Sequence, residues 1–305
     1  MVINDKVLDD LSAQTKAMET YHTHRVFSTE EFKFAMDMLD TYPWIKRDLH
    51  RRGFDEMIDR LVLDDKERDL LAALLRDFVY VDVDECEDLL QSIIEQLQKW
   101  GCNKENTVIV AINKRVREND GSVIFLKQLE DRLYGWKKRN FQVFFDYRRK
   151  FRSARGYKKV VLIDDFIGSG KTMAGRLKEI MSVMAGTRSN IEIYVVALAG
   201  LAEAKHKFPE LNDRNVYVPL WLNNAFDRTT DHEKTKTMDI ILERLNKKNN
   251  NGERSNLDIF GYGYKNSAGL YYNVHYRIPN NVLAMFWWGC FKENKDTYHS
   301  MFRRS

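Results

Sequence analysis

The chain has 305 residues, of which 44% are hydrophobic and 31% charged, enough for one large domain or two modest ones. No run approaches the roughly 20 apolar residues that cross a bilayer, and the N-terminus is polar, so we expect a cytoplasmic protein with no membrane contact. Three widely spaced cysteines, Cys86, Cys102 and Cys290, fit neither a disulfide framework nor a zinc site and are interpreted as free thiols.

The first hundred residues are predicted to form an acidic helical domain. They carry 13 Lys and Arg against 23 Asp and Glu. Ser28 is a candidate N-cap, because Phe32, Met36 and Leu39 follow it at helical spacing. Residues 64–78 and 84–100 show the same amphipathic pattern, and we interpret their apolar faces as core.

From residue 101 onward the pattern changes to strands that alternate with helices. Short apolar runs predict strands at 106–112, 141–145, 160–164 and 191–200, with helices after the turn at Gly121-Ser122 and after Thr172. Further downstream, strands are expected at 216–221 and 271–278, and a helix at 234–247. This alternation predicts an α/β fold with a mostly parallel sheet over residues 101–305, behind the helical domain of residues 1–100.

The segment 160–172, VVLIDDFIGSGKT, carries the chemistry. Asp164 and Asp165 follow a predicted strand at the edge of the sheet where ligands bind. Two adjacent carboxylates can accept hydrogen bonds from vicinal hydroxyls or reach a magnesium ion. The following loop, Gly168, Ser169, Gly170, Lys171 and Thr172, leads into a helix whose exposed amides favour a phosphate. The segment therefore predicts a site for a phosphorylated ribose.

A nucleotide-binding Walker loop is the main competing interpretation, because the segment ends in Gly-Lys-Thr. That loop needs a glycine five positions before its second glycine, and Asp165 stands there instead. The next predicted strand, 191–200, also lacks an acidic residue at its end that would hold magnesium. Both departures argue against a P-loop nucleoside triphosphatase.

A strand, an acidic pair and Gly-Ser-Gly-Lys-Thr resemble the ribose-phosphate signature of type I phosphoribosyltransferases, over about residues 102–200. The resemblance implies a phosphoribosyltransferase (Rossmann-like) sheet in which Asp164 and Asp165 hold the ribose hydroxyls of phosphoribosyl pyrophosphate and residues 168–172 wrap its 5′-phosphate. It also implies that Ser122 belongs to a pyrophosphate loop and that Mg²⁺ accompanies the substrate, near Asp164 and Asp165. Purine-salvage members carry a further acid where this chain has Gly168, so binding is a safer expectation than transfer.

A second resemblance lies at residues 274–289, VHYRIPNNVLAMFWWG. It is similar to the C-terminal signature of phosphoribosyltransferase-like proteins of bacterial anti-phage systems, some of them encoded beside retrons, which share the form of Ile163 to Gly170. This resemblance implies a toxic effector that acts on nucleotides and is controlled by protein partners. His275, Arg277, Asn280 and Asn281 would contact a base or phosphate, although an Asn-stabilised turn explains the same residues without a ligand.

Residues 101–160 form the basic part of the chain, with 16 Lys and Arg against 6 Asp and Glu. In phosphoribosyltransferases a mobile loop in this region closes on the pyrophosphate, and Arg149 and Arg152 are candidates for that role. A solvated or partner-facing loop is the simpler alternative, and contact with nucleic acid is a third, because aromatic residues interleave with the charges. Besides an enzyme, a nucleotide sensor without turnover and a subunit that binds nucleic acid or a protein therefore remain open.

Overall fold

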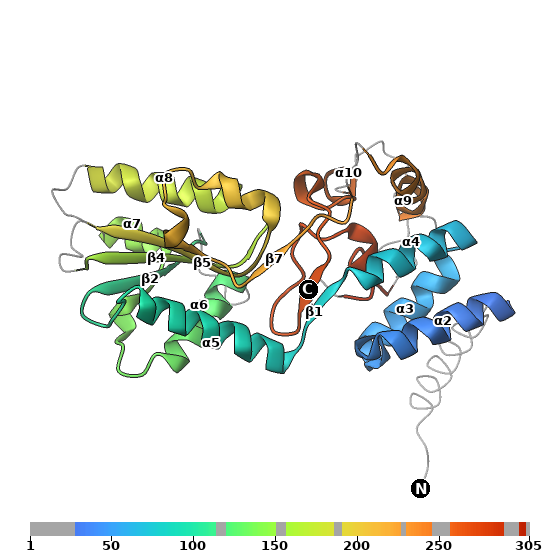
Figure 1. The fold of residues 1–305 in the computed structure, drawn as a ribbon, viewed down its shortest axis with the longest axis horizontal. Coiled ribbons are helices and arrows are strands. Elements are labelled where there is room, and N and C mark those ends of the chain that lie inside the picture. The colour runs from blue at the N-terminus through green and yellow to red at the C-terminus, as the bar shows by residue number, and fades with distance from the viewer. Residues whose placement is uncertain are drawn as a thin grey trace, which may run out of the picture.

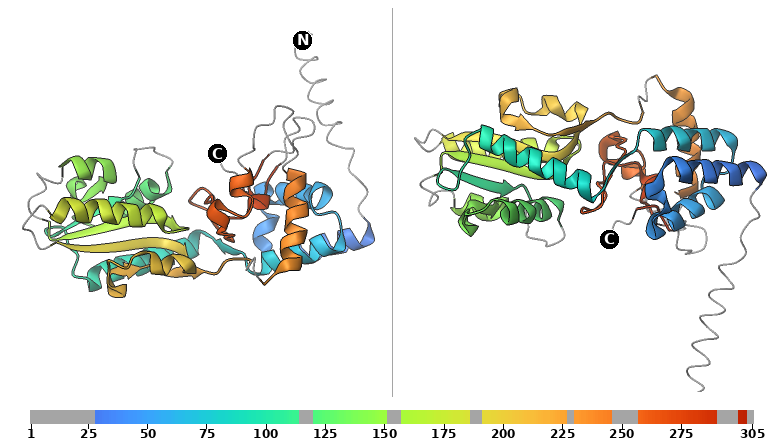
Figure 2. Two further views of the ribbon diagram at one scale, coloured as in Figure 1. Left: turned by 90° about the horizontal axis from the view of Figure 1, so that it is seen from above. Right: turned by 60° about the horizontal axis from the view of Figure 1, so that its bottom comes forward.

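The protein has two lobes, one built around a parallel sheet and one mainly helical (Figure 1). Both views in Figure 2 show the same separation. The computed structural model describes residues 28–113, 120–150, 157–185, 191–226, 230–245, 257–289 and 299–302. No helix in these ranges is both long and apolar enough to cross a membrane.

The sheet confirms the predicted α/β class. Its strand order is β3-β2-β4-β5-β6, β7 also pairs with β5, and every pairing is parallel. The strands are β2 (Thr107–Ala111), β3 (Phe141–Val143), β4 (Lys159–Ile167), β5 (Glu192–Leu201), β6 (Val216–Tyr217) and β7 (Leu220–Leu222). Nearly every residue of β2, β4 and β5 is buried or half-buried, as expected of strands that helices cover on both faces.

Two layers of helices cover this sheet, with α8 (Lys171–Ala185) above it and α5 (Val83–Lys99) below it in Figure 1. Side chains alternate between the two faces. Ile109 and Val161 pack in the cluster that includes α5 and α6 (Gly121–Arg132), whereas Val110 and Leu162 pack with α7 (Phe144–Lys150) and α8. The sheet therefore has a buried hydrophobic core on each of its two faces.

The helical lobe contains α2 (Thr29–Thr41), α3 (Asp48–Arg60), α4 (Asp65–Arg76), α9 (His232–Leu245) and α10 (Leu257–Phe260). The expected N-cap is confirmed, because the N–H of Glu31 donates to Oγ of Ser28 at 3.1 Å. Short 3-10 helices occur at Pro43–Lys46, Lys138–Asn140, Ala202–Lys207, Asp213–Asn215, Tyr264–Asn266 and Ala284–Phe286.

Three strand predictions need correction. The strand expected at 141–145 ends at Val143, and α7 begins at once, because Phe144 and Tyr147 face the sheet at helical spacing. The strand expected at 216–221 is divided into β6 and β7 around Pro219, which has no N–H for a ladder. Of residues 271–278, only β8 (Tyr271–Asn273) is a strand, and it lies outside the main sheet.

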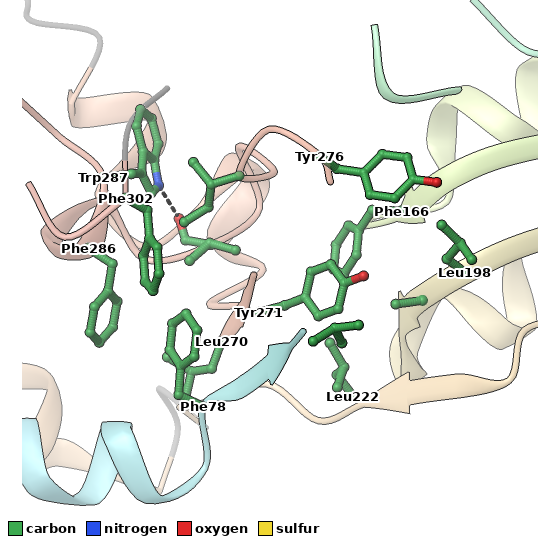
Figure 3. Close-up of a cluster of buried hydrophobic side chains, with 14 of the residues drawn as sticks. Phe78, Phe166, Leu198, Leu222, Leu270, Tyr271, Tyr276, Phe286, Trp287 and Phe302 are labelled. Carbon is green, nitrogen blue, oxygen red and sulfur yellow. Dashed lines mark hydrogen bonds between the residues drawn. The ribbon is translucent and has the colours of Figure 1, made fainter. Parts of the chain in front are cut away.

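β8 connects a C-terminal segment of the chain to an N-terminal one. It pairs in parallel with β1 (Val79–Val81). Figure 3 shows Tyr271 between Phe166 of the sheet lobe and the apolar side chains of the helical lobe, and the rings of Phe166 and Tyr271 stack at 5.0 Å. A domain boundary near residue 100 stays a prediction, and the β1–β8 pairing is a contact that crosses it.

Candidate functional site

The site lies where the strand order of the sheet reverses. From β2 the chain goes to β3 on one side, and from β4 it goes to β5 on the other, so a crevice opens between the carboxyl ends of β2 and β4. β2 ends at Ala111 opposite Ile163, whereas β4 continues to Ile167 along β5. The acidic pair therefore lies inside β4 rather than after it, at the first positions that β2 leaves uncovered.

A pocket of about 410 Å³ fills this crevice. Three segments of the chain form it: the start of α6, the end of β4 with the following loop, and a C-terminal segment that contains Pro279. Its lining residues are Asn113, Asp120, Gly121, Ser122, Asp164–Met173, Tyr264 and Arg277–Asn281. A pocket of this size matches those that hold small ligands and cofactors.

Asp164 and Asp165 are half-buried in the pocket wall. The N–H of Asp165 donates to Oδ1 of Asp164 at 3.1 Å. Gly121 at the start of α6 lies directly against the second carboxylate, since a Cβ there would be 2.2 Å from Oδ2 of Asp165. The helix thus approaches the acidic pair more closely than any residue with a side chain would allow.

The surroundings of the pair disfavour two negative charges. Burial raises the pKa of Asp164 well above its ordinary value, and the charge of Asp165 raises it further. Burial also raises the pKa of Asp165 to about 6, with a smaller contribution from the charge of Asp120. A ligand that donates hydrogen bonds or brings a cation would relieve this cost.

The pair predicts a specific pH dependence of stability. The pKa of Asp165 is 3.8 in the unfolded chain and about 6 in the folded protein, so between these pH values the folded protein binds more protons. The stabilising contribution of the pair to the free energy of unfolding is therefore largest below this pH range and is lost as pH rises through it. We expect the unfolding free energy of the wild type, relative to Asp164→Asn/Asp165→Asn, to fall between about pH 5 and about pH 7.5. Urea unfolding of both proteins at the two pH values measures this difference, and a constant difference would contradict the raised pKa values.

The loop after β4 and the start of α8 have the backbone geometry that is typical of an anion-binding site. Gly170 has a φ of +69°, in the left-handed region, and so turns the chain into the helix. The first N–H groups of α8 have no partners within the helix, and its dipole favours a negative charge there. Lys171 and Thr172 are exposed at the pocket, and Lys171 has no ion-pair partner among the described residues. Buried Arg176 fixes α8 to the end of β2 by donating to the carbonyl of Ile112 at 3.0 Å.

The start of α6 forms a second polar corner of the pocket. Ser122 is 2% exposed, and its Oγ has no hydrogen-bond partner within the described structure. Asp120 precedes the helix, but its side chain does not cap the helix. A buried hydroxyl without a partner is costly, and a ligand oxygen in the pocket would satisfy it. Two helix N-termini therefore face one pocket, with the acidic pair between them.

The two sequence signatures meet at Gly168. A Cβ on this residue would lie 2.1 Å from both Cγ and Oδ1 of Asn281. Asn281 is 7% exposed, and its Nδ2 donates to Oγ of Ser267 at 3.0 Å. Its carbonyl accepts from the N–H of Gly269 at 2.7 Å. Asn281 thus packs directly against the loop after β4 and is hydrogen-bonded to the turn around residues 263–268.

The turn itself is held in a conformation of high backbone energy. Gly263 has a φ of +75°, and Lys265, Asn266 and Ala268 also have positive φ values. The N–H of Tyr264 donates to the carbonyl of Asn280 at 2.7 Å, which places the Tyr264 side chain in the pocket wall. Such conformations persist where the surrounding contacts require them, here at the edge of the pocket.

Most of the residues singled out from the sequence line this one pocket. They are Ser122, Asp164, Asp165, Gly168, Ser169, Gly170, Lys171, Thr172, Arg277, Asn280 and Asn281. His275 does not line it and is an exposed residue whose N–H donates to Oδ1 of Asn273. The side chain of Arg149 and the whole of Arg152 lie outside the described residues.

Three polar lining residues were not anticipated from the sequence: Asn113, Asp120 and Tyr264. Asp120 was detectable in principle, because it precedes a glycine and the apolar face of a helix. Tyr264 had no local signal, since a long-range bond to Asn280 places it. The described residues contain no group of three or more His, Cys, Asp or Glu that could hold a metal ion alone.

Comparison with known proteins gives one family and one solved structure. A family model described as PRTase-CE matches residues 44–304. No curated protein matches the chain. The chain is similar to the Helicobacter pylori xanthine-guanine-hypoxanthine phosphoribosyltransferase at 12% identity, over 52% of this chain and 96% of that one, with a TM-score of 0.27. That level of structural similarity carries no conclusion by itself.

Proposed function

Since the chain belongs to the PRTase-CE family of phosphoribosyltransferase-like proteins, we propose that its pocket binds a 5′-phosphorylated ribose, as phosphoribosyl pyrophosphate or as a nucleotide. One observation carries the proposal: the N-termini of α6 and α8 face the same pocket, with Asp164 and Asp165 between them. A ribose with phosphate groups at both ends complements this arrangement: its two anionic ends would face the helix N-termini and its hydroxyls would face the two carboxylates. The match supports phosphoribosyl pyrophosphate better than a ligand with one anionic end.

Each part of the site has a role in this proposal. The 5′-phosphate lies at residues 168–172, where the free amides of α8 and Lys171 favour it. The ribose hydroxyls donate to Asp164 and Asp165. The pyrophosphate lies at the start of α6, where the Ser122 hydroxyl donates to it. Arg277 and Asn280 line the remaining wall and contact the group attached to ribose C1.

Magnesium fits this site as a companion of the substrate. The pocket offers the carboxylates of Asp164, Asp165 and Asp120 beside the place proposed for the pyrophosphate, and Mg²⁺ is commonly held by one or two carboxylates together with substrate phosphates. Bound there, the ion would neutralise the charge of the pyrophosphate. Its presence would also lower the raised pKa values of the acidic pair.

Transfer at ribose C1 is the reaction that such binding would allow. The bond from C1 to the pyrophosphate oxygen breaks, an acceptor forms a bond to C1, and positive charge develops on the ring in the transition state. Asp164 and Asp165 orient the sugar and stabilise that charge, so positioning and electrostatics supply the rate. Gly168 offers no acid or base, which leaves a nucleotide sensor without turnover as the second candidate function.

Calorimetric titration tests the binding proposal. We expect the full chain to bind phosphoribosyl pyrophosphate more tightly with Mg²⁺ than without it, and to bind ribose 5-phosphate and nucleoside monophosphates more weakly. Nucleosides without a phosphate are the matched control and are expected not to bind. Equal binding of nucleosides and their monophosphates, or no binding of any phosphorylated ribose, would contradict the proposal.

Ser122→Ala separates ligand binding from folding. Removing a buried hydroxyl without a partner is expected to raise the unfolding free energy of the ligand-free protein, by up to about 1–3 kcal/mol. The same change is expected to weaken binding of phosphoribosyl pyrophosphate, because the pyrophosphate loses a donor. Chemical unfolding and titration measure the two effects. A variant that is less stable and binds normally would show that Ser122 serves the fold alone.

The biological setting is also a proposal: an anti-phage effector that acts on nucleotides and is controlled by protein partners in the cytoplasm. It rests on the similarity of residues 274–289 and 163–170 to such proteins. Metabolite profiling of cells that express the wild type or Asp164→Asn/Asp165→Asn tests it. We expect nucleotide or phosphoribosyl pyrophosphate pools to change only with the wild type, and identical profiles would favour a sensor or a scaffold.

A further inference from the structure

A second charged surface lies at the opposite edge of the sheet from the pocket. In a parallel sheet the amino ends of all strands lie together, and here the loops before β2 and β3 meet residues 157–158, which directly precede β4, at that edge. These loops carry exposed cationic side chains at Lys104, Lys137, Lys138, Arg139 and Lys158. We call these five residues, together with Tyr134, the basic edge.

Hydrogen bonds join the three loops into one surface. The side chain of Asn140, which is 0% exposed, donates to the carbonyls of Lys104 at 2.9 Å and Thr107 at 2.8 Å. The hydroxyl of Tyr157 donates to the carbonyl of Arg139 at 3.2 Å. The N–H of Lys158 donates to the carbonyl of Asn106 at 2.8 Å. The loops that carry the cations are therefore held together by the fold, although they come from distant parts of the sequence.

These charges are largely uncompensated. The basic edge has one ion pair within the described structure, between Lys104 and Glu105 at 3.9 Å, and both of its side chains are exposed. An exposed pair at that distance contributes little stability. Several like charges held together repel one another and favour an anionic partner.

An aromatic ring stands beside the cations. Tyr134 is 95% exposed, whereas the next most exposed large hydrophobic side chain of the described structure, Phe32, is 60% exposed. Tyr134 begins the turn at Gly135, whose φ of +78° is favourable only for glycine, and a Cβ on Gly135 would lie 3.9 Å from Nζ of Lys104. The ring is thus presented to solvent at the side of the charged surface.

We propose that the basic edge binds single-stranded nucleic acid, with the cations on the phosphates and a base stacked on Tyr134. Stacking on aromatic side chains beside a positive surface is how proteins hold single strands without reading their sequence. A duplex hides the faces of its bases, and a peptide made only of Asp and Glu has no aromatic group that would stack on the exposed ring. The proposal does not depend on the ligand of the pocket, because the two surfaces lie at opposite edges of the sheet.

Fluorescence anisotropy with labelled 20-nucleotide DNA and RNA strands tests the proposal on the full chain. With about five phosphates contacted, the logarithm of the binding constant should fall with the logarithm of the salt concentration with a slope of roughly −3.5. Lys137→Glu/Lys138→Glu should abolish binding at moderate salt. Lys33→Glu/Lys66→Glu makes the same change of charge at two exposed lysines of the helical lobe and should leave binding nearly intact.

Tyr134 distinguishes a nucleic acid from other anions. Tyr134→Ala should weaken binding roughly 5- to 100-fold, whereas Tyr134→Phe keeps the ring and should retain affinity. A duplex of the same sequence and polyglutamate of matched charge should bind more weakly than the single strand. The proposal is wrong if Lys137→Glu/Lys138→Glu binds like the wild type. It is also wrong if duplex or polyglutamate binds as tightly as the single strand, or if Tyr134→Ala has no effect.

Discussion

Gly168→Ala is expected to abolish binding of a phosphorylated ribose and to destabilise the fold. The new Cβ would lie 2.1 Å from Cγ and Oδ1 of Asn281, and Asn281 is held by Ser267 and Gly269 and has little freedom to move. Overpacking of this kind commonly costs about 1–3 kcal/mol. Because Gly168 belongs to the loop proposed to bind the 5′-phosphate, affinity should be lost along with stability. Urea unfolding and calorimetric titration with phosphoribosyl pyrophosphate measure both.

Gly175→Ala is the matched control for this change. Gly175 is an exposed residue of α8, and a Cβ there meets no atom within 4 Å. Alanine has the higher helix propensity, so this variant should be up to about 1 kcal/mol more stable and should bind normally. If Gly168→Ala behaves like Gly175→Ala, the contact with Asn281 does not constrain the loop.

A double variant tests the contact itself. Asn281→Ala removes the three side-chain atoms that clash with the new Cβ, so Gly168→Ala/Asn281→Ala should be more stable than the sum of the single effects predicts. Coupling energies of contacting residues are typically about 0.5–3 kcal/mol. Additive effects would show that the two signatures touch without depending on each other.

Asp164→Asn/Asp165→Asn is expected to reduce affinity for phosphoribosyl pyrophosphate by on the order of 100-fold or more, since two charge-assisted hydrogen bonds to the ribose hydroxyls are lost. The ligand-free variant should also be more stable than the wild type at neutral pH. Both pKa values are raised in the folded protein, so keeping the two carboxylates ionised costs free energy that the amides do not require. Titration and thermal unfolding at neutral pH measure the two effects.

The opposite directions of these effects distinguish a binding site from a structural acid pair. Asp37→Asn/Asp69→Asn removes two exposed carboxylates of the helical lobe and should change neither property measurably. A double variant at the pocket that loses stability would indicate that the pair supports the fold. Unchanged affinity would remove the central element of the proposed function.

Local pattern was sufficient for much of the fold. The helices α2, α4 and α5 and the strands β2, β4 and β5 lie close to their predicted positions, because each has a clear period and a capping or turn residue at its ends. The strand predicted at 141–145 was wrong in part, since a run of five residues with four apolar side chains fits a strand and a helical turn equally well. The strand predicted at 216–221 is divided because Pro219 has no backbone N–H. Its partner strand, β5, could be identified only from the structure.

The candidate site divides in the same way. Asp164, Asp165 and the loop to Thr172 lie next to one another in the sequence, so their shared chemistry was visible. The opposite wall of the pocket depends on tertiary contacts, such as that of Asn281 with Gly168, and no local pattern announces them. Gly168 was interpreted as standing where purine-salvage members carry an acidic residue, and the structure adds a steric reason for glycine at that position.

The pairing of β1 with β8 sets an order of assembly during synthesis. Most elements of the sheet lobe, from α5 to β7, are continuous in the chain, and the strand pairing of the main sheet involves no residue beyond 222. The helical lobe cannot complete its core until Tyr271, Phe286 and Phe302 have left the ribosome. Phe302 packs against Trp44, Phe286 packs against Phe78, and Tyr271 pairs with the strand β1. The pocket also requires residues 277–281, so a nascent chain forms it only after these residues have been synthesised.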